Sequence, residues 1–264
     1  MKGLFFATLL LFLYSCSGYN SVLKGDDYKR KFELANELYD GKKFDRCIAL
    51  YEQVYQRSSK TGEGELAYYR LGKASYEIED WYLASYYLGS FQNKFPYSNK
   101  VEETVFLSAM CAVQNSPEPS LDQDETEFAI GDLQSFVLRF PNSELVDTCN
   151  AMMSKLRFKL ETKDVLNIRL YSKTENYRAA TVTSEEFLAN YPKSQFREEM
   201  AVIRIQNSYK LTLNSVEDKK EARKIKTLSY IKDFIAEFPN SDYLREFGIY
   251  NKELEDLVIE KKVN

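Results

Sequence analysis

Apolar residues recur at spacings of three and four along most of the chain, which is the pattern of amphipathic α-helices. The apolar segments are separated by short polar turns, such as the one from Asp40 to Lys43. No stretch keeps the strict alternation of apolar and polar residues that marks a β-strand over a convincing length. The pattern therefore predicts an all-α protein.

Four copies of one short phrase divide these helical segments. Each copy has an aromatic residue, a second aromatic four positions later, then proline, one variable residue and serine; the copies are Phe91–Ser98, Phe136–Ser143, Phe187–Ser194 and Phe234–Ser241. Aromatics four residues apart lie on one face of a helix, and proline disfavours helical geometry in the residue before it. Serine is a good cap for the next helix. Each phrase is therefore predicted to end one helix and to begin another.

The phrases and turns together predict about five helical hairpins. Within the second hairpin, Leu71, Gly72, Ala84 and Pro96 stand at positions that resemble the tetratricopeptide repeat, where small residues let paired helices approach closely. The expected hairpins run from Asp26 to Arg57, from Glu65 to Phe95, from Lys100 to Arg139, from Glu144 to Tyr191 (as segments 144–160, 165–171 and 175–191) and from Gln195 to Phe238, with a capping helix at 242–260.

The expected architecture is therefore a tetratricopeptide-like solenoid of about five hairpins with a C-terminal capping helix. It forms one domain over residues 26–260, with N-terminal repeats at 26–98, a middle repeat and long helix at 99–162, and C-terminal repeats and cap at 163–260.

The first residues read as a secretion signal. Lys2 is followed by an apolar run from Gly3 to Tyr14, which is too short to span a bilayer. The run ends in Leu13-Tyr14-Ser15-Cys16, which resembles the bacterial lipobox. That resemblance implies a signal peptide at 1–15, cleavage before Cys16, acylation of Cys16 with chains such as palmitate, and a flexible linker at 16–25. The alternative is a buried helix at the start of the fold.

Charge and composition narrow the possible chemistry. The formal net charge is -4, so no overall basic field is available to bind nucleic acid. The chain has no histidine, which removes the commonest general base and the usual zinc ligand. We therefore expect no cofactor, no metal site and no enzymatic activity. Cys47, Cys111 and Cys149 are expected as small buried apolar residues, or with one bridge from Cys111 to Cys149.

Binding of other polypeptides is the remaining expectation. In arrays of helical hairpins, the first helix of each hairpin lines a concave groove, and tyrosines with interspersed polar groups suit an extended peptide. The alternative for each residue is packing against a neighbouring helix. The candidate groove residues are Lys29, Phe32, Asn36 and Tyr39 from the first hairpin and Tyr69, Lys73 and Tyr76 from the second.

The chain also resembles the BamD family of lipoproteins of the β-barrel assembly machinery, in a Bacteroidetes-like form. The resemblance rests on the lipobox, the five hairpins, the repeated phrases, and the segment Ser116–Gln123 followed by Ala129–Phe136. It implies an outer-membrane lipoprotein that faces the periplasm and binds the POTRA domains of the barrel protein BamA through its C-terminal repeats, over roughly 163–250. Its N-terminal repeats would receive unfolded β-barrel precursors.

Two other functions stay open at this point. The chain could be another periplasmic repeat lipoprotein that acts as an adaptor for peptidoglycan or envelope-division enzymes. It could also be an enzyme of a type that the sequence does not identify.

Overall fold

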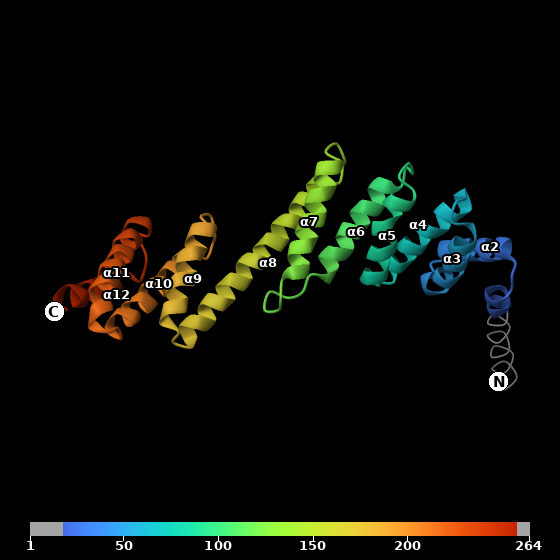
Figure 1. Ribbon diagram of the computed structural model, residues 1–264. Coiled ribbons are helices and arrows are strands. Elements are labelled where there is room, and N and C mark those ends of the chain that lie inside the picture. The colour runs from blue at the N-terminus through green and yellow to red at the C-terminus, as the bar shows by residue number, and fades with distance from the viewer. Residues whose placement is uncertain (1–17, 258–264) are drawn as a thin grey trace, which may run out of the picture. The chain divides into compact units, whose positions relative to one another are not determined.

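A computed structural model describes residues 18–257; residues 1–17 and 258–264 lie outside the described part. The signal peptide, Cys16 and the end of the expected capping helix therefore fall outside it. Within 18–257 all regular secondary structure is helical, and no strand is formed (Figure 1). Consecutive helices pack against one another as tetratricopeptide-like hairpins, which confirms the expected fold class.

The chain divides into two compact units, with the boundary between Arg157 and Phe158 inside helix α8. The single domain expected over 26–260 stays a prediction. The first unit contains α2 (Tyr28–Asp40), α3 (Phe44–Ser58), α4 (Gly62–Glu77), α5 (Trp81–Lys94), α6 (Val101–Asn115), α7 (Asp124–Arg139) and the start of α8 (Val146–Lys173). The second contains the rest of α8, α9 (Tyr177–Asn190), α10 (Arg197–Leu213), α11 (Glu217–Glu237) and α12 (Leu244–Asp256).

The four repeated phrases form the same turn each time. The helix ends just before the second aromatic, so Phe95, Phe140, Tyr191 and Phe238 are C-caps with φ between -133° and -119°. Each serine hydroxyl accepts a hydrogen bond from the backbone N–H two residues later, at 2.9–3.3 Å. The next α-helix begins three residues after the serine, so the serine caps a short turn that leads into the helix.

The turns inside three hairpins share a second geometry. Lys42, Glu79 and Glu175 have φ of 56°, 62° and 58°, the left-handed region in which a side chain is strained. After Glu79 and Glu175, Asp80 and Asn176 accept hydrogen bonds from Leu83 N–H and Ala179 N–H. These caps start the second helix of the hairpin.

Each unit has its own apolar core. In the first unit Leu50, Leu71, Leu88 and Leu133 are at most 1% exposed, and in the second Ile168 is as deeply buried. Cys47, Cys111 and Cys149 are buried free thiols, so the expectation of small buried residues is confirmed and the Cys111 to Cys149 bridge is not formed.

Two expectations from the sequence differ from the structure. The segments expected at 144–160 and 165–171 are one continuous helix, α8, because residues 161–164 contain neither glycine nor proline to interrupt it. Residues 18–24, expected within a flexible linker, are helical, because Tyr19, Val22 and Leu23 have an apolar core to pack on. The Tyr19 hydroxyl also donates a 2.9 Å hydrogen bond to Arg46 O, which fixes this helix to α3.

Candidate functional site

The first helices of three hairpins, α2, α4 and α6, lie side by side in the first unit, since α4 contacts both α2 and α6. Their aligned faces carry an array of aromatic and charged side chains. We call this array the N-terminal surface, formed by Asn36, Tyr39 and Asp40 from α2, Tyr69, Arg70 and Lys73 from α4, and Glu103 from α6.

Arg70 joins α2, α3 and α4. Its Nη1 donates hydrogen bonds to Asn36 Oδ1 at 2.8 Å and to the Tyr51 hydroxyl at 3.3 Å, and it lies 3.4 Å from Asp40 Oδ1. Its guanidinium carbon also lies 4.7 Å from the centroid of the Tyr39 ring, a cation–π contact. The Tyr51 hydroxyl donates to Asn36 Oδ1 at 2.8 Å, which closes the network. Arg70 is thus held at the surface with its charge partly exposed.

Glu103 joins α6 to α4. Its carboxylate accepts a hydrogen bond from the Tyr69 hydroxyl at 2.6 Å and forms a salt bridge with Lys73 Nζ at 2.7 Å. Burial opposes ionisation of Glu103, but the hydrogen bonds from Lys73 and Tyr69 outweigh it and lower the pKa of Glu103. Burial, together with the bond to Glu103, raises the pKa of Tyr69 to about 12. Glu103 is therefore ionised and Tyr69 neutral over the physiological range.

The structure brings four of the seven predicted groove residues into this array: Asn36, Tyr39, Tyr69 and Lys73. The other three lie at its edges or beneath it. Lys29 is exposed, Phe32 packs edge-on against Tyr51 with ring centroids 6.5 Å apart, and Tyr76 packs edge-on against Trp81 at 5.1 Å. The binding role of all seven stays a prediction.

Sequence reasoning missed Arg70 and Glu103, which make the strongest polar contacts of the surface. A signal for both existed. Arg70 follows Asn36 by 34 residues, and Glu103 follows Tyr69 by 34 residues, which is the nominal tetratricopeptide length of about 34 residues. Partners on successive first helices could have been sought at that offset.

The second unit has a comparable array on α8, α10 and α12, which we call the C-terminal surface. Arg169 forms two hydrogen bonds to Glu199, at 2.6 and 2.7 Å, which link α8 to α10. Tyr209 of α10 stacks flat on Tyr250 of α12, with ring centroids 4.0 Å apart and planes 2° apart. Gln206 Nε2 donates to Glu246 Oε1 at 3.0 Å beside this stack.

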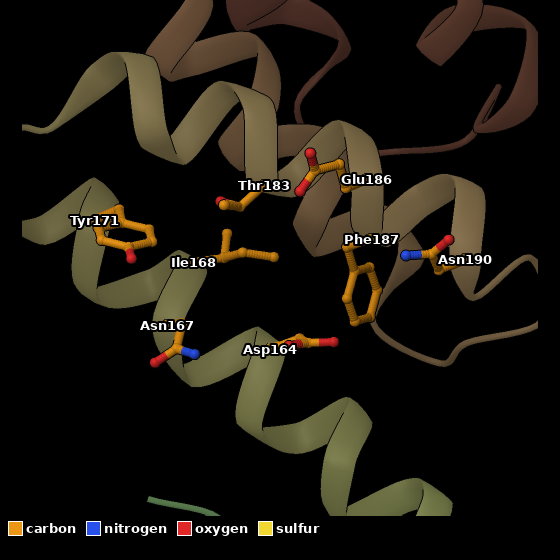
Figure 2. A pocket seen from close by; sticks show the side chains of 8 residues that line it. All are labelled: Asp164, Asn167, Ile168, Tyr171, Thr183, Glu186, Phe187 and Asn190. Atoms are coloured by element: carbon orange, nitrogen blue, oxygen red, sulfur yellow. The ribbon is translucent and has the colours of Figure 1, made fainter. Parts of the chain in front are cut away.

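A polar pocket of about 230 Å³ opens between α8 and α9 in the same unit (Figure 2). Its floor is apolar, formed by the buried Ile168 and Phe187. Two carboxylates face it, Asp164 and Glu186, and Asp164 accepts a 2.8 Å hydrogen bond from the Tyr191 hydroxyl. Asn167, Tyr171, Thr183 and Asn190 complete the lining. Such a pocket is suited to a polar or basic side chain of a partner.

Over residues 18–257 no group of three histidine, cysteine or carboxylate side chains is placed to hold a metal ion. Burial raises the pKa of Cys47 and of Cys111 to about 12, so these thiols stay protonated and unreactive.

In the described part of the chain no helix combines the length and the hydrophobicity that crossing a bilayer requires.

The fold, with its aligned helix faces, belongs to the class of tetratricopeptide-like helical-repeat proteins. Comparison with known families is more specific. Residues 27–224 match the model of the YfiO family, described as an outer membrane lipoprotein, and the chain belongs to that family. No curated protein matches it.

Proposed function

We propose that the protein is a BamD-like scaffold of the outer-membrane β-barrel assembly machinery, which acts without making or breaking covalent bonds. The observation that carries the proposal is the family match, because residues 27–224 include the whole N-terminal surface and much of the second unit. Acyl chains on Cys16 would anchor the protein to the outer membrane with its helical units in the periplasm.

In this proposal the N-terminal surface receives unfolded barrel precursors. Tyr39 and Tyr69 offer aromatic area, while Arg70 and Lys73 offer donors for the main chain or the terminal carboxylate of an extended segment. Holding a precursor near the insertion machinery raises its effective concentration, which speeds assembly without a chemical step.

Tyrosine variants test this role. Tyr39, Tyr69 and Tyr76 replaced together by Ala should weaken binding of a labelled peptide from the last strand of a barrel precursor about tenfold or more, measured by fluorescence anisotropy. The matched Tyr→Phe triple variant keeps the ring area and should retain most of the affinity. If circular dichroism shows that both proteins are folded and they bind the peptide with equal affinity, the N-terminal surface is not the precursor-binding site.

The second unit is proposed to bind the POTRA domains of a BamA-like barrel protein. Purification from native envelopes in mild detergent should recover such a barrel protein in near-stoichiometric amount. The Tyr→Ala variant should recover as much as the wild type, since its changes lie in the first unit. Recovery of a murein hydrolase in place of the barrel protein would support an adaptor for peptidoglycan enzymes instead.

A further inference from the structure

A second cavity lies in the first unit, between the second helices of two successive hairpins. It has a volume of about 210 Å³, several times the roughly 30 Å³ that one water molecule takes up in the liquid. Small side chains form most of its wall: Gly89 of α5, Ser108 and Ala109 of α6, and Ser135 of α7. Asp132 of α7 supplies its one carboxylate.

The close approach of α5 to α6 depends on Gly89. A Cβ atom at this position would lie 2.9 Å from Ser108 Oγ, closer than packed side-chain atoms normally come. Gln92 also lines the cavity, and its side chain accepts a hydrogen bond from Arg139. Asp132 is exposed on the surface of α7, and no hydrogen bond or ion pair is formed by its carboxylate within residues 18–257. The protein atoms around that carboxylate partly desolvate it, which raises the pKa of Asp132.

The repeated phrases allow positions in the two units to be matched, and so identify the residues of the second unit that correspond to Ser108 and Asp132 of the cavity. Ser108 stands twelve residues after Pro96, and Arg204 stands twelve residues after Pro192. Asp132 stands four residues before Phe136, and Tyr230 stands four residues before Phe234. The small Ser108 and the acidic Asp132 are thus replaced by a long cation and an aromatic ring.

In the second unit Arg204 fills this place. Its guanidinium carbon lies 4.1 Å from the centroid of the Tyr230 ring. Glu185 corresponds to Gly89, because each stands two residues before the first aromatic of its phrase, Phe187 or Phe91. The negative charge of Glu185 stabilises the positive charge of Arg204. The repeat architecture therefore accommodates a guanidinium between successive second helices and places an acidic side chain beside it.

A second depression continues the cavity along α7. It is lined by Asp124, Glu127, Phe128, Gly131 and Asp132, so Asp132 belongs to both. The Phe128 ring is 69% exposed. Three carboxylates beside an exposed aromatic ring complement a basic polypeptide segment, through charge and through apolar contact with the stem of a long cationic side chain.

The cavity and the depression share Asp132 and together form a groove along α7. We propose that this groove binds a basic segment of a partner protein, whose arginine or lysine side chain enters the cavity and pairs with Asp132. The partner's cation takes the place that Arg204 fills in the second unit. This site is separate from the N-terminal surface, which is formed by the first helices α2, α4 and α6. It stands whether or not that surface binds barrel precursors.

A single-side-chain probe tests the site on the folded chain. N-acetyl-arginine amide is titrated into ¹⁵N-labelled protein, and the backbone amide signals of Gly89 and Gly131 are followed by NMR. We expect saturable shifts at these glycines, with Kd on the order of 1–10 mM for one side chain. The uncharged analogue N-acetyl-citrulline amide should not produce them, since it cannot pair with a carboxylate.

Three variants complete the test. Asp132→Asn should raise Kd about tenfold, because it removes the charge that strengthens the hydrogen bond. Ser108→Arg should abolish the shifts by placing an arginine in the cavity from within. The matched control is Asp147→Asn, an exposed aspartate in the first turn of α8, and it should leave Kd unchanged.

The proposal fails if Asp132→Asn binds as tightly as the wild type, or if the citrulline analogue gives the same shifts. It also fails if the arginine probe shifts signals over all acidic helix faces without saturating at Gly89 and Gly131. Should Ser108→Arg not fold, the Asp132→Asn variant and the citrulline analogue still decide the question.

Discussion

Arg70 makes more contacts across helices than any other charge of the N-terminal surface that the structure describes. It bonds to Asn36 and Tyr51, approaches Asp40 and covers the ring of Tyr39. The guanidinium suits this position because its planar fork can bond and stack at once, which an ammonium group cannot do. Arg70 therefore stabilises the packing of α4 on α2 while presenting charge to a partner.

We expect Arg70→Ala to lower the free energy of unfolding by about 1–2 kcal/mol, through lost hydrogen bonds and lost contact with the Tyr39 ring. Arg70→Lys should recover less than half of this loss. Urea denaturation followed by circular dichroism measures both. The control is Arg30→Ala, whose salt bridges to Glu33 and Glu37 are exposed, so its loss should be clearly smaller than that of Arg70→Ala. Equal losses for Arg70→Ala and Arg30→Ala would contradict this role.

The lowered pKa of Glu103 predicts that the free energy of unfolding depends on pH. Its pKa is lowered from the ordinary 4.5 in the folded protein, so the ionised form stabilises the fold above that value and the stabilisation is lost as pH falls through the lowered folded pKa. The difference in unfolding free energy between the wild type and Glu103→Gln should be largest above the ordinary pKa of 4.5 and should shrink as pH falls through the lowered pKa of Glu103. The difference should stay below about 1 kcal/mol, because the pair is partly exposed. A difference that is constant from neutral to acid pH would show that Glu103 acts without its charge.

At the scale of the element, the turns inside the hairpins hold local strain. Lys42, Glu79 and Glu175 have positive φ although none is glycine. In the two hairpins where a capping Asp80 or Asn176 follows, the cap offsets part of that cost. In these two hairpins the turn geometry is therefore stabilised by the capping residue that follows the strained one.

Glu79→Gly should raise the free energy of unfolding by about 0.5–1 kcal/mol, because glycine adopts positive φ without a Cβ clash. Glu79→Ala keeps the clash and should change stability little. Glu77→Gly, two residues earlier at the last residue of α4, has no positive φ to relieve and should instead lower stability by less than about 1 kcal/mol. Thermal and urea unfolding of the three variants would test this order, and a destabilised Glu79→Gly protein would show that the side chain of Glu79 has a role of its own.

Most elements could be predicted from the sequence because their signals are local. The prolines of the phrases and the apolar spacing fix helix ends within a few residues, as at α6 and α7. The continuity of α8 also had a local signal, since residues 161–164 contain neither glycine nor proline. The helix at 18–24 could not be predicted, because it depends on packing against α3 and other residues farther along the chain. The pairing of Glu103 with Lys73 was missed for a related reason, since it needs the register of one helix on another.

At the scale of the whole molecule, the two units present surfaces of similar chemistry. Tyrosines, carboxylates and arginine or lysine alternate on α2, α4 and α6 in the first unit and on α8, α10 and α12 in the second. Two such surfaces would suit the proposed scaffold function, in which the first unit binds a barrel precursor and the second unit a barrel protein.

Membrane anchoring is predicted to depend on one residue. Cells fed alkyne-palmitate should incorporate it into the wild-type protein and not into Cys16→Ser, whose hydroxyl replaces the thiol that would be acylated. The control Ser17→Ala leaves the lipobox intact and should be labelled as the wild type. Label retained in Cys16→Ser would mean that another residue is acylated and that the lipobox reading is wrong.

The turns formed by the four repeated phrases also bear on how such a chain can evolve. The backbone hydrogen bonds of each turn lie within the turn, and the longer-range bonds of Ser98 and Ser194 go to Glu65 and Glu161 at the same offset of 33 residues. A duplication or deletion that starts in one copy and stops in the next would therefore leave an intact junction. Recombination between the gene segments that encode these copies could therefore add or remove a complete hairpin. Relatives could then differ in length by whole hairpins while keeping the same turns between them.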